Sequence, residues 1–409
     1  MTFGHSFRDE HFTILEKGVL NVNHGSYGLI PNQVFDKYID NIQREYAFPD
    51  RFFLEEILPQ FEAAATLVAE KYYHCDPHNV AFVQNATIGV NTILRLLKFS
   101  KGDRFVIADT IYGACHNTLK FLVKRFGIIL DIIKLEYPME DEAVVDLWEK
   151  RLPGAKLALF DAITLMPGVI FPYQKITKLC RKYDVISLID GAHAIGQIML
   201  DLGALKPDFF VSNLHKWLNV PRGTAALYVD PHFFAEIQTL PVSHSYVDED
   251  ISATPLTFWT KFFFVGTNNY ASIPAIAEAI KFREETCGGE DKIAQYCRGL
   301  NQQLQHLIAK KWPFSQLVEN STKTLIPYGM VTYWLPIQKF IEYFDLSVKL
   351  DTSNAEQLEK FRLGVDHLMH YTYKSRFPFA FVGDRIILRF STQIYNELLD
   401  YDYATDISF

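Results

Sequence analysis

The sequence predicts an α/β protein with a mostly parallel central sheet that carries helices on both faces, followed by a smaller C-terminal α+β domain. Between residues 79 and 230, short apolar runs rich in Val, Ile and Phe alternate with segments of helical periodicity. This alternation is expected for buried parallel strands joined by helical crossovers. After about residue 270 the pattern changes to long helices and a few strand-like pieces, which indicates a second domain.

The elements of the large domain follow in order along the chain. Residues 31–74 carry apolar side chains three and four positions apart, which is typical of amphipathic helices. The predicted strands come next: "NVAFVQ", "DRFVIAD", "GIILDIIKL", "KLALFDAI", "DVISLID", "DFFVSN" and "TAALYVD". Helices are predicted between them, among others at 88–98, 113–125 and 173–183. Ligands of such sheets bind beyond the carboxyl ends of the strands.

The C-terminal part is predicted to be a small α+β domain. Its predicted elements are helices over "PAIAEAIKFREE" and "DKIAQYCRGLNQQLQHLIAKKW", strand-like pieces around 323–335, a helix near 354–372 and a strand in "DRIILRFS". We therefore expect an N-terminal arm at 1–30 that lies over the active site, a large α/β domain at 31–275 and a small domain at 276–409.

Charge and composition exclude several classes of partner. The chain of 409 residues has a net charge of −8 and a sequence pI of about 5.9, so it lacks the basic footprint of nucleic-acid-binding proteins. No stretch approaches the roughly 20 consecutive apolar residues of a membrane helix, and "MTFGHSFRDEHF" is too polar for a signal peptide. We expect a cytoplasmic protein that binds a small molecule and neither nucleic acid nor membrane.

The cysteines indicate neither a disulfide framework nor a metal site. They are odd in number and lack metal-ligand spacing; their positions are Cys75, Cys115, Cys180, Cys287 and Cys297. Reduced thiols and no bound metal are the expectation.

Two ionisable residues stand at the ends of neighbouring apolar runs. Asp190 ends the run in "LIDGAHAIGQ", and Lys216 lies in "SNLHKW". Charges in such places cost free energy unless they are neutralised. A structural salt bridge between them is one explanation, although burying such a pair is often a net loss. The other is pyridoxal 5′-phosphate, which needs a lysine for attachment, an acidic partner for its pyridine nitrogen and a phosphate site.

Other residues that follow strands fit the same cofactor, and each also has a structural explanation. Thr87 could help a helix N-terminus to hold phosphate, or it could simply cap that helix. Tyr112 could stack on the cofactor ring or pack at a surface edge. Thr164 precedes a Pro-Gly pair, which marks turns in many proteins. The remaining candidates are His193, for the phenolic oxygen of the cofactor, and Asn213 and His215, for its phosphate region.

Four segments carry a resemblance to a known family: "NVNHGSYGLIP", "QNATIGVN", "LIDGAHAIGQ" and "FFVSNLHKWLNVPRGTAALYV". The sequence resembles the class V aminotransferase family of fold-type I pyridoxal phosphate enzymes. Within it, the resemblance is to the branch of isopenicillin N epimerase-like proteins and fungal hercynylcysteine sulfoxide lyases. It runs from about residue 20 to 400, and its motifs are more specific for the cofactor than for the reaction.

The resemblance implies roles for the cofactor-binding residues. Lys216 would bind the cofactor covalently, Asp190 would contact its pyridine nitrogen and Tyr112 would stack on its ring. Ala86 and Thr87 would hold the phosphate, and Thr164 and His193 would lie near the phenolic oxygen.

The resemblance also implies a homodimer and a substrate site. Gly266 and Thr267, in "FFFVGTNN", match a segment that reaches the phosphate of the partner subunit; Asn268 stands where relatives often have aspartate. Arg389 would bind the substrate α-carboxylate, a task for which the guanidinium geometry is suited. The segment from Asn23 through His24 to Gly25 would fold over the mouth of the site.

Carbon–sulfur cleavage of hercynylcysteine sulfoxide in ergothioneine synthesis is the reaction that the resemblance implies. Lys216, or Tyr112 close to it, would remove the α-proton, and the sulfur leaving group, pyruvate and ammonia would be released. An epimerase or an aminotransferase is the alternative. A cysteine desulfurase is disfavoured because it needs a thiol on a mobile C-terminal loop and no cysteine follows Cys297. A non-catalytic scaffold is disfavoured because Lys216, Asp190 and Arg389 are all present.

Aromatic residues in "REYAFPDRFF" are candidates for holding the trimethylated end of such a substrate. Tyr46, Phe48 and Phe52 lie in this segment, and aromatic faces attract quaternary ammonium groups. Packing at a helix end explains the same residues.

Overall fold

A computed structural model describes residues 2–246, 258, 260–343, 351 and 354–406 of the chain. The chain divides into two compact units. The large unit comprises Gly28–Leu165 and Ile170–Phe282, and the small unit comprises Met1–Tyr27, Met166–Val169 and Arg283–Phe409. The N-terminal arm therefore packs with C-terminal elements inside the small unit.

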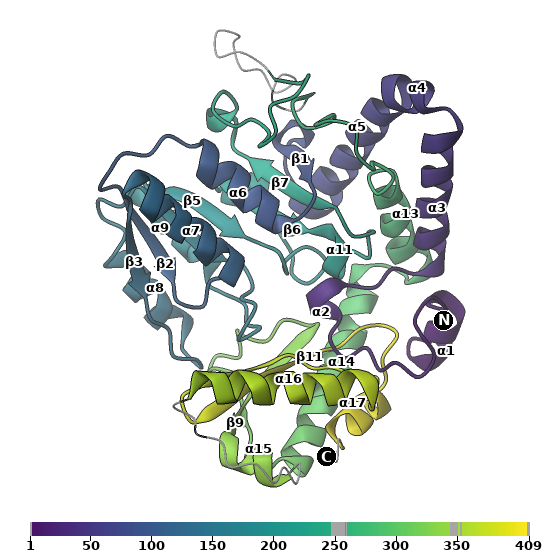
Figure 1. Ribbon diagram of the computed structural model, residues 1–409, viewed down its shortest axis with the longest axis vertical. Helices are drawn as coiled ribbons and strands as arrows, with labels where there is room; N and C mark the ends of the chain where they lie inside the picture. The colour runs from purple at the N-terminus through teal and green to yellow at the C-terminus, as the bar shows by residue number, and fades with distance from the viewer. Residues whose placement is uncertain (1, 247–257, 259, 344–350, 352–353, 407–409) are drawn as a thin grey trace. The chain divides into compact units, whose positions relative to one another are not determined.

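The large unit is built on a seven-stranded sheet in the order β1-β7-β6-β5-β4-β2-β3 (Figure 1). Its strands are β1 (Val80–Val83), β2 (Arg104–Ala108), β3 (Ile129–Ile133), β4 (Leu157–Asp161), β5 (Ile186–Asp190), β6 (Phe209–Asn213) and β7 (Ala225–Val229). Strands β2 to β6 pair in parallel, and β7 is antiparallel to both of its neighbours, β6 and β1. Every predicted apolar run of this domain is a strand, and the mostly parallel sheet is confirmed.

Helices cover both faces of this sheet, as predicted. The connections β1 to β2 and β2 to β3 advance toward one edge, whereas those from β3 to β6 advance toward the other. Since such crossovers are right-handed, the two sets of helices lie on opposite faces. One set is α6 (Ala86–Leu96) and α7 (Gly113–Phe126), and the other is α8 (Asp141–Glu149), α9 (Tyr173–Lys182) and α10 (Leu202–Leu205). Contacts within each set, α6 with α7 and α8 with α9, agree with this division.

Of the remaining helices of the large unit, α5 (Ile57–Val68) contacts β1 and α11 (Leu214–Trp217) contacts β7. Among them, α13 packs against α3 and α5. Their bounds are α3 (Asn32–Ala47), α4 (Pro49–Arg51), α5 (Ile57–Val68) and α13 (Ala275–Lys281), with α11 (Leu214–Trp217) after β6. Short π or 3-10 turns are η1 (Phe52–Glu56), η2 (Ala69–Tyr73), η3 (Pro77–Asn79), η4 (Pro231–Phe233) and η5 (Phe282–Thr286).

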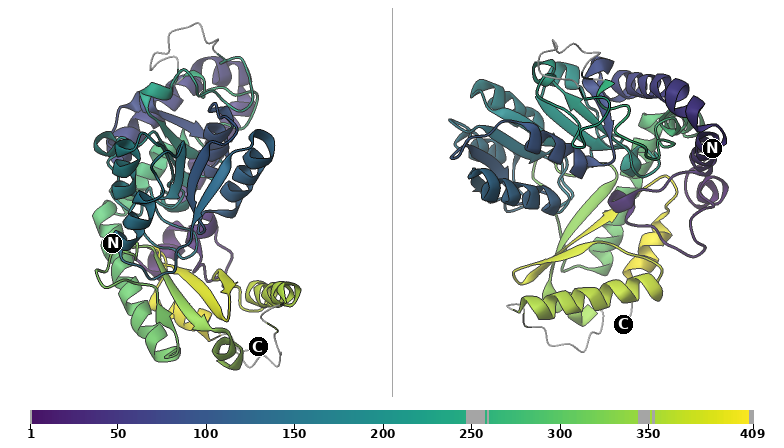
Figure 2. Two further views of the ribbon diagram at one scale, coloured as in Figure 1. Left: turned by 90° about the vertical axis from the view of Figure 1, so that its left-hand side faces the viewer. Right: turned by 45° about the horizontal axis from the view of Figure 1, so that its top comes forward.

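The small unit contains an antiparallel sheet in the order β10-β11-β9-β8. Its strands are β8 (Gln316–Leu317), β9 (Met330–Pro336), β10 (Phe379–Val382) and β11 (Arg385–Ser391). Its helices are α1 (His5–His11), α2 (His24–Tyr27), α14 (Glu290–Lys311), α15 (Ile337–Tyr343), α16 (Ala355–Tyr371) and α17 (Leu398–Thr405). Figure 2 shows α16 alongside this sheet, and Met369 of α16 shares a buried cluster with Phe390 of β11 and Val22 of the arm.

No helix in the described part of the chain is both long enough and apolar enough to span a membrane.

Candidate active site

The two ionisable residues singled out by the sequence follow adjacent strands of the large unit. Asp190 is the last residue of β5, and Lys216 lies in α11, the single helical turn after β6. These strands pair in parallel, with Asp190 opposite Val211. Both side chains are buried, with exposed fractions of 3% for Asp190 and 9% for Lys216. The strand formed by the second apolar run thus ends at Asn213, three residues before Lys216, which lies in the following helical turn.

Two donors contact the Asp190 carboxylate. The Ala192 N–H donates to Oδ1 at 2.9 Å, and the Cys115 thiol donates to Oδ2 at 3.4 Å. Burial raises the pKa of Asp190, although these two donors oppose the shift. Among the described residues, no ion pair within 4.0 Å joins Asp190 and Lys216. The structure does not contain the salt bridge considered above.

A second buried carboxylate, Asp161, lies beside Asp190. Asp161 is the last residue of β4 and is the register partner of Asp190, and its exposed fraction is 5%. Burial and the neighbouring Asp190 raise the pKa of Asp161 well above its ordinary value. The sequence analysis missed this residue, although "KLALFD" carries the same signal as "SLID": an apolar run that ends in a carboxylate.

Lys216 contacts a histidine that also contacts a tryptophan. The Lys216 Nζ lies 3.0 Å from Nε2 of His193. On the other side of the same ring, the indole N–H of Trp217 donates to Nδ1 at 3.2 Å. His193 and Trp217 are both buried. Trp217 was not a predicted site residue, because nothing in the local pattern shows that its ring reaches His193.

The turn after β5 is held closely against α11. Gly196 has a φ of 75°, and a Cβ at this position would lie 2.6 Å from the Trp217 carbonyl oxygen, so only glycine fits here without displacement. The Ser212 hydroxyl donates to the Gly191 carbonyl and accepts the Ile195 N–H at 3.2 Å. The motif "DGAHAIG" therefore positions His193 as well as Asp190.

The N-terminus of α6 offers donors for an anion. Asn85 caps the helix by accepting the Ile88 N–H at 2.9 Å, and the Ala86 N–H donates to Asn213 Oδ1 at 2.8 Å. Thr87 is thus not the cap. Among the described residues, none accepts a hydrogen bond from the Thr87 N–H or its hydroxyl. The structure thus brings Ala86, Thr87 and Asn213 together. The N–H and the hydroxyl of Thr87 remain available to bind an anion.

The other predicted residues of the large unit also follow strands. Tyr112 occupies the N-cap position of α7 without a capping hydrogen bond from its side chain and is 42% exposed, whereas Thr164 is buried just after β4. The Nδ1–H of His215 donates to the Thr224 carbonyl at 3.3 Å, since a carbonyl can only accept. Burial is the largest cause that lowers the pKa of His215 to about 4, and the charge of Arg222 adds to it.

A second group of predicted residues meets inside the small unit. Arg389, on β11, is completely buried, and one of its guanidinium nitrogens lies 3.4 Å from Asn23 Oδ1 and 3.4 Å from the Ser26 hydroxyl. Burial and the charge of Arg376 lower the pKa of Arg389 to about 10. These two contacts, both with neutral oxygens, hold the buried guanidinium against the arm.

Two further close contacts lie in the small unit. A Cβ at Gly168 would lie 2.7 Å from Arg389 Cδ, so the Pro-Gly turn leaves room for this side chain. The Nδ1 of His24 lies 2.9 Å from the Tyr395 hydroxyl, and His24 is buried. His24 thus belongs to a packed hydrogen-bonded network of the small unit.

The segment predicted to face a partner subunit is exposed. Thr267 and Asn268 are exposed and Gly266, with a φ of 123°, is half-buried. The Asn268 side chain accepts the following backbone N–H at 2.8 Å. Of the aromatic candidates, Tyr46 and Phe48 are exposed, whereas Phe52 is 2% exposed and packs in a core cluster, so the three do not share one surface.

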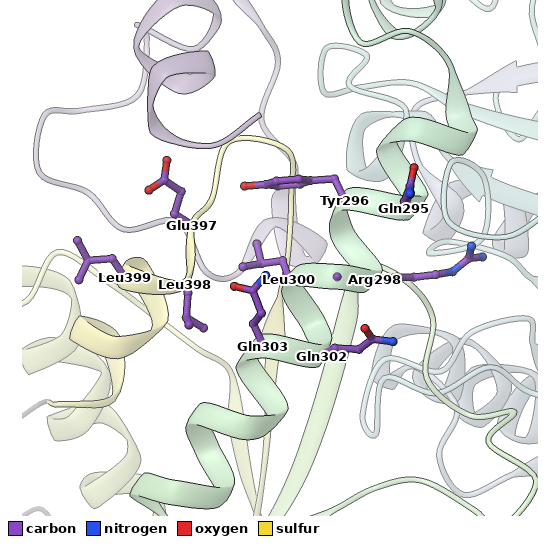
Figure 3. A pocket seen from close by; sticks show the side chains of 10 residues that line it. Gln295, Tyr296, Arg298, Leu300, Gln302, Gln303, Glu397, Leu398 and Leu399 are labelled. Atoms are coloured by element: carbon purple, nitrogen blue, oxygen red, sulfur yellow. The ribbon is translucent and has the colours of Figure 1, made fainter. Parts of the chain in front are cut away.

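A pocket of about 820 Å³ lies elsewhere, in the small unit. Figure 3 shows its lining side chains on α14 and at the start of α17, and none of them is a predicted site residue. Among the described residues, no group of three or more His, Cys, Asp and Glu side chains could hold a metal ion.

Comparisons with known proteins show which family the chain resembles. The family model "Aminotransferase class-V" matches residues 28–328. Hercynylcysteine sulfoxide lyase of Schizosaccharomyces pombe is 31% identical over 339 residues, which cover 82% of this chain and 84% of that protein. Isopenicillin N epimerase of Streptomyces clavuligerus is 26% identical over 79% of this chain and 82% of that protein.

Solved structures of one lyase share the fold. A cystine C–S lyase in complex with cysteine persulfide has a TM-score of 0.74 at 18% identity and covers 97% of this chain and 100% of that chain. A mutant of it with glycine covalently linked to the PLP cofactor has a TM-score of 0.74 at 19% identity, covering 97% and 98%. The predicted fold is confirmed.

Proposed function

Because the chain belongs to the class V aminotransferase family, we propose that it cleaves the carbon–sulfur bond of hercynylcysteine sulfoxide, a step of ergothioneine biosynthesis. The family and its lyase-named relative make the chain a pyridoxal phosphate-dependent lyase. The identity of the substrate is the proposal. The observation that carries it is the 31% identity to a hercynylcysteine sulfoxide lyase across 82% of this chain and 84% of that protein.

The buried groups of the large unit fit the cofactor. Burial disfavours the charged form of Asp190, and a protonated pyridine nitrogen would supply the missing positive charge. The available donors of Thr87, at the N-terminus of α6, suit a phosphate. Lys216 supplies a buried amine for attachment. When bound, pyridoxal phosphate supplies an electron-withdrawing ring that stabilises negative charge at the α-carbon of an amino acid.

The chain's own residues would divide the remaining tasks. Lys216 would move the α-proton, with Tyr112 as a second candidate. Arg389 would bind the substrate α-carboxylate, a task for which the planar guanidinium is suited. The other assignments are as follows: Asp190 for the pyridine nitrogen, Tyr112 for ring stacking, His193 and Thr164 for the phenolic oxygen, Ala86, Thr87, Asn213 and His215 for the phosphate, and Asn23 and His24 beside the substrate.

The overall reaction is an elimination followed by hydrolysis. The α C–H bond and the β C–S bond break, and the electron pair of the C–S bond leaves with sulfur as a sulfenate. In sum, R–S(O)–CH2–CH(NH3+)–CO2− and water give R–SOH, pyruvate and NH4+. No oxidant or reductant is needed.

Persulfide chemistry has no support in this chain. The last cysteines, Cys287 and Cys297, are buried, and burial raises the pKa of each thiol to about 12. A thiol that accepts sulfur acts as an accessible thiolate, which these two are not.

A homodimer is part of the proposal. Gly266 and Thr267 lie in an exposed segment of the large unit, where they would reach the phosphate bound by the partner subunit. Sedimentation at several protein concentrations would test this state, and a stable monomer that binds the cofactor with full occupancy would contradict it.

The test is an assay of purified, cofactor-loaded protein against hercynylcysteine sulfoxide, unoxidised hercynylcysteine, cystine and isopenicillin N. We expect pyruvate to form in a one-to-one ratio with the released sulfur product, and most rapidly from the sulfoxide. Lys216→Ala should abolish it, while Lys120→Ala, at an exposed position of α7, should not. Pyruvate formed equally from all sulfur substrates, or from none, would refute the substrate assignment.

The relative named isopenicillin N epimerase, 26% identical over 79% of this chain, favours epimerisation as a second candidate. An epimerase would incorporate deuterium from D2O at the α-carbon and invert it without forming pyruvate. The same incubations, followed by mass spectrometry and chiral chromatography, distinguish the two reactions.

A further inference from the structure

One buried histidine connects the lysine of the proposed active site with a tryptophan. The His193 ring is 3.0 Å from Lys216 through Nε2 and 3.2 Å from the Trp217 indole nitrogen through Nδ1. The exposed fractions are 2% for His193, 1% for Trp217 and 9% for Lys216. Both ring nitrogens are therefore engaged by side chains in a place that excludes bulk water.

The tryptophan contact determines where the ring carries its proton. An indole nitrogen is a donor and never an acceptor, so Nδ1 of His193 must present a lone pair. A neutral imidazole has one proton, and it must then reside on Nε2. Since Nε2 donates, the nitrogen it faces on Lys216 accepts with its own lone pair, as a free amine does and an ammonium cannot.

The surrounding backbone holds this arrangement in place. Gly196 brings the turn that carries His193 to within contact of the Trp217 carbonyl. Gln197 donates its side-chain N–H to the His193 carbonyl at 2.9 Å. Ser212, the second-last residue of β6, bonds to the same turn. The ring of His193 and the indole are thus attached to one rigid strand–turn assembly, which favours a fixed hydrogen-bond geometry.

We propose that Trp217 is a positioning residue: its indole N–H holds His193 as the Nε2–H tautomer, so that this N–H points at Lys216 and keeps it a free amine. The tautomer is a property of the cofactor-free chain. Its consequence for catalysis rests on the proposed function, in which Lys216 must be uncharged to attach the cofactor and the His193 N–H faces the phenolic oxygen.

Nitrogen NMR of the cofactor-free protein tests the tautomer directly. The sample carries ¹⁵N-labelled histidine, and the His193→Gln spectrum identifies the His193 signals among the 13 histidines. We expect Nε2 at the chemical shift of a protonated nitrogen and Nδ1 at that of a non-protonated one. A proton on Nδ1, or on both nitrogens, at neutral pH would overturn the proposal without any variant of Trp217.

Trp217→Phe removes the donor but keeps an aromatic ring. The matched control is Trp148→Phe, because Trp148 is equally buried and, within the described chain, its indole N–H has no hydrogen-bond partner. We expect the His193 Nδ1 signal to move toward the protonated range in Trp217→Phe and to stay in Trp148→Phe. An unchanged signal in folded Trp217→Phe would overturn the role of Trp217.

Steady-state kinetics connect the tautomer to turnover. Loss of one hydrogen bond predicts a decrease in kcat of about fivefold to tenfold in Trp217→Phe, with KM little changed, and no such decrease in Trp148→Phe. Equal kcat in the two variants would refute the catalytic part. If no substrate turns over, the proposed function fails, but the NMR result still decides the tautomer.

Discussion

Protonation of His215 should weaken the fold as the pH falls, and the structure gives the size of the effect. Burial is the main cause that lowers its pKa from 6.5 to about 4. Since one pKa unit corresponds to about 1.4 kcal/mol, the fully expressed difference corresponds to roughly 3 kcal/mol. The unfolded chain binds this proton below about pH 6.5, whereas the folded chain binds it only near pH 4. The unfolded state therefore holds more protons in this window, and stability is lost as the pH falls.

Urea unfolding of the cofactor-free protein at pH 7 and pH 5 measures this loss. Linkage predicts that His215 contributes about 2 kcal/mol to the decrease in unfolding free energy between these pH values, reduced to about 1–2 kcal/mol by solvent screening of a half-buried ring. His215→Gln removes the titrating group. Between pH 7 and pH 5 its unfolding free energy should therefore decrease by about 1–2 kcal/mol less than that of the wild type. His306→Gln, at an exposed position of α14, is the control. If His215→Gln and wild type lose the same free energy, the reasoning about burial is refuted.

Three further substitutions test other parts of the site. Lys216→Ala should abolish pyruvate formation and leave the circular dichroism spectrum unchanged; full activity would show that the chemistry lies elsewhere. Arg389→Ala should raise KM for amino-acid substrates by up to about 100-fold, because a charged partner of the carboxylate is lost; an unchanged KM would exclude that role. Cys115→Ala removes the thiol donor to Asp190 and should weaken cofactor binding about fivefold in a titration of the apoprotein. Equal affinities in wild type and variant would show that the thiol contributes nothing.

The strands of the large unit could be predicted because burial on both faces makes them continuous apolar runs. The predicted segment "DVISLID" contains β5 (Ile186–Asp190), and "DFFVSN" contains β6 (Phe209–Asn213). In the small unit the prediction was less accurate. The strand-like region around 323–335 overlaps β9, which begins only at Met330. The two-residue strand β8 was not predicted, because so short a segment has no periodicity to detect.

The residues of the candidate site could be predicted only where their position along the chain marks them. Asp190 and Lys216 follow apolar runs, and Asp161 could have been found by the same rule. Cys115 and Trp217 could not, because their contacts are formed between segments distant in sequence: Cys115 lies 75 residues from Asp190, and Trp217 lies 24 residues from His193. Such pairs depend on which helices and turns the sheet brings together.

The surroundings of Asp190 and Lys216 explain why these two side chains do not form a salt bridge with each other. Burial raises the pKa of Asp190 and of its neighbour Asp161, so the chain alone disfavours charge on these carboxyls. On the other side, the proposed His193 tautomer uses the lone pair of Lys216, which disfavours an ammonium there. This state suits the proposed cofactor. Its cationic ring nitrogen would stabilise the Asp190 carboxylate, and its aldehyde would react with the Lys216 amine. A pre-formed salt bridge would have to be broken first, at a cost of several kcal/mol for each buried ion.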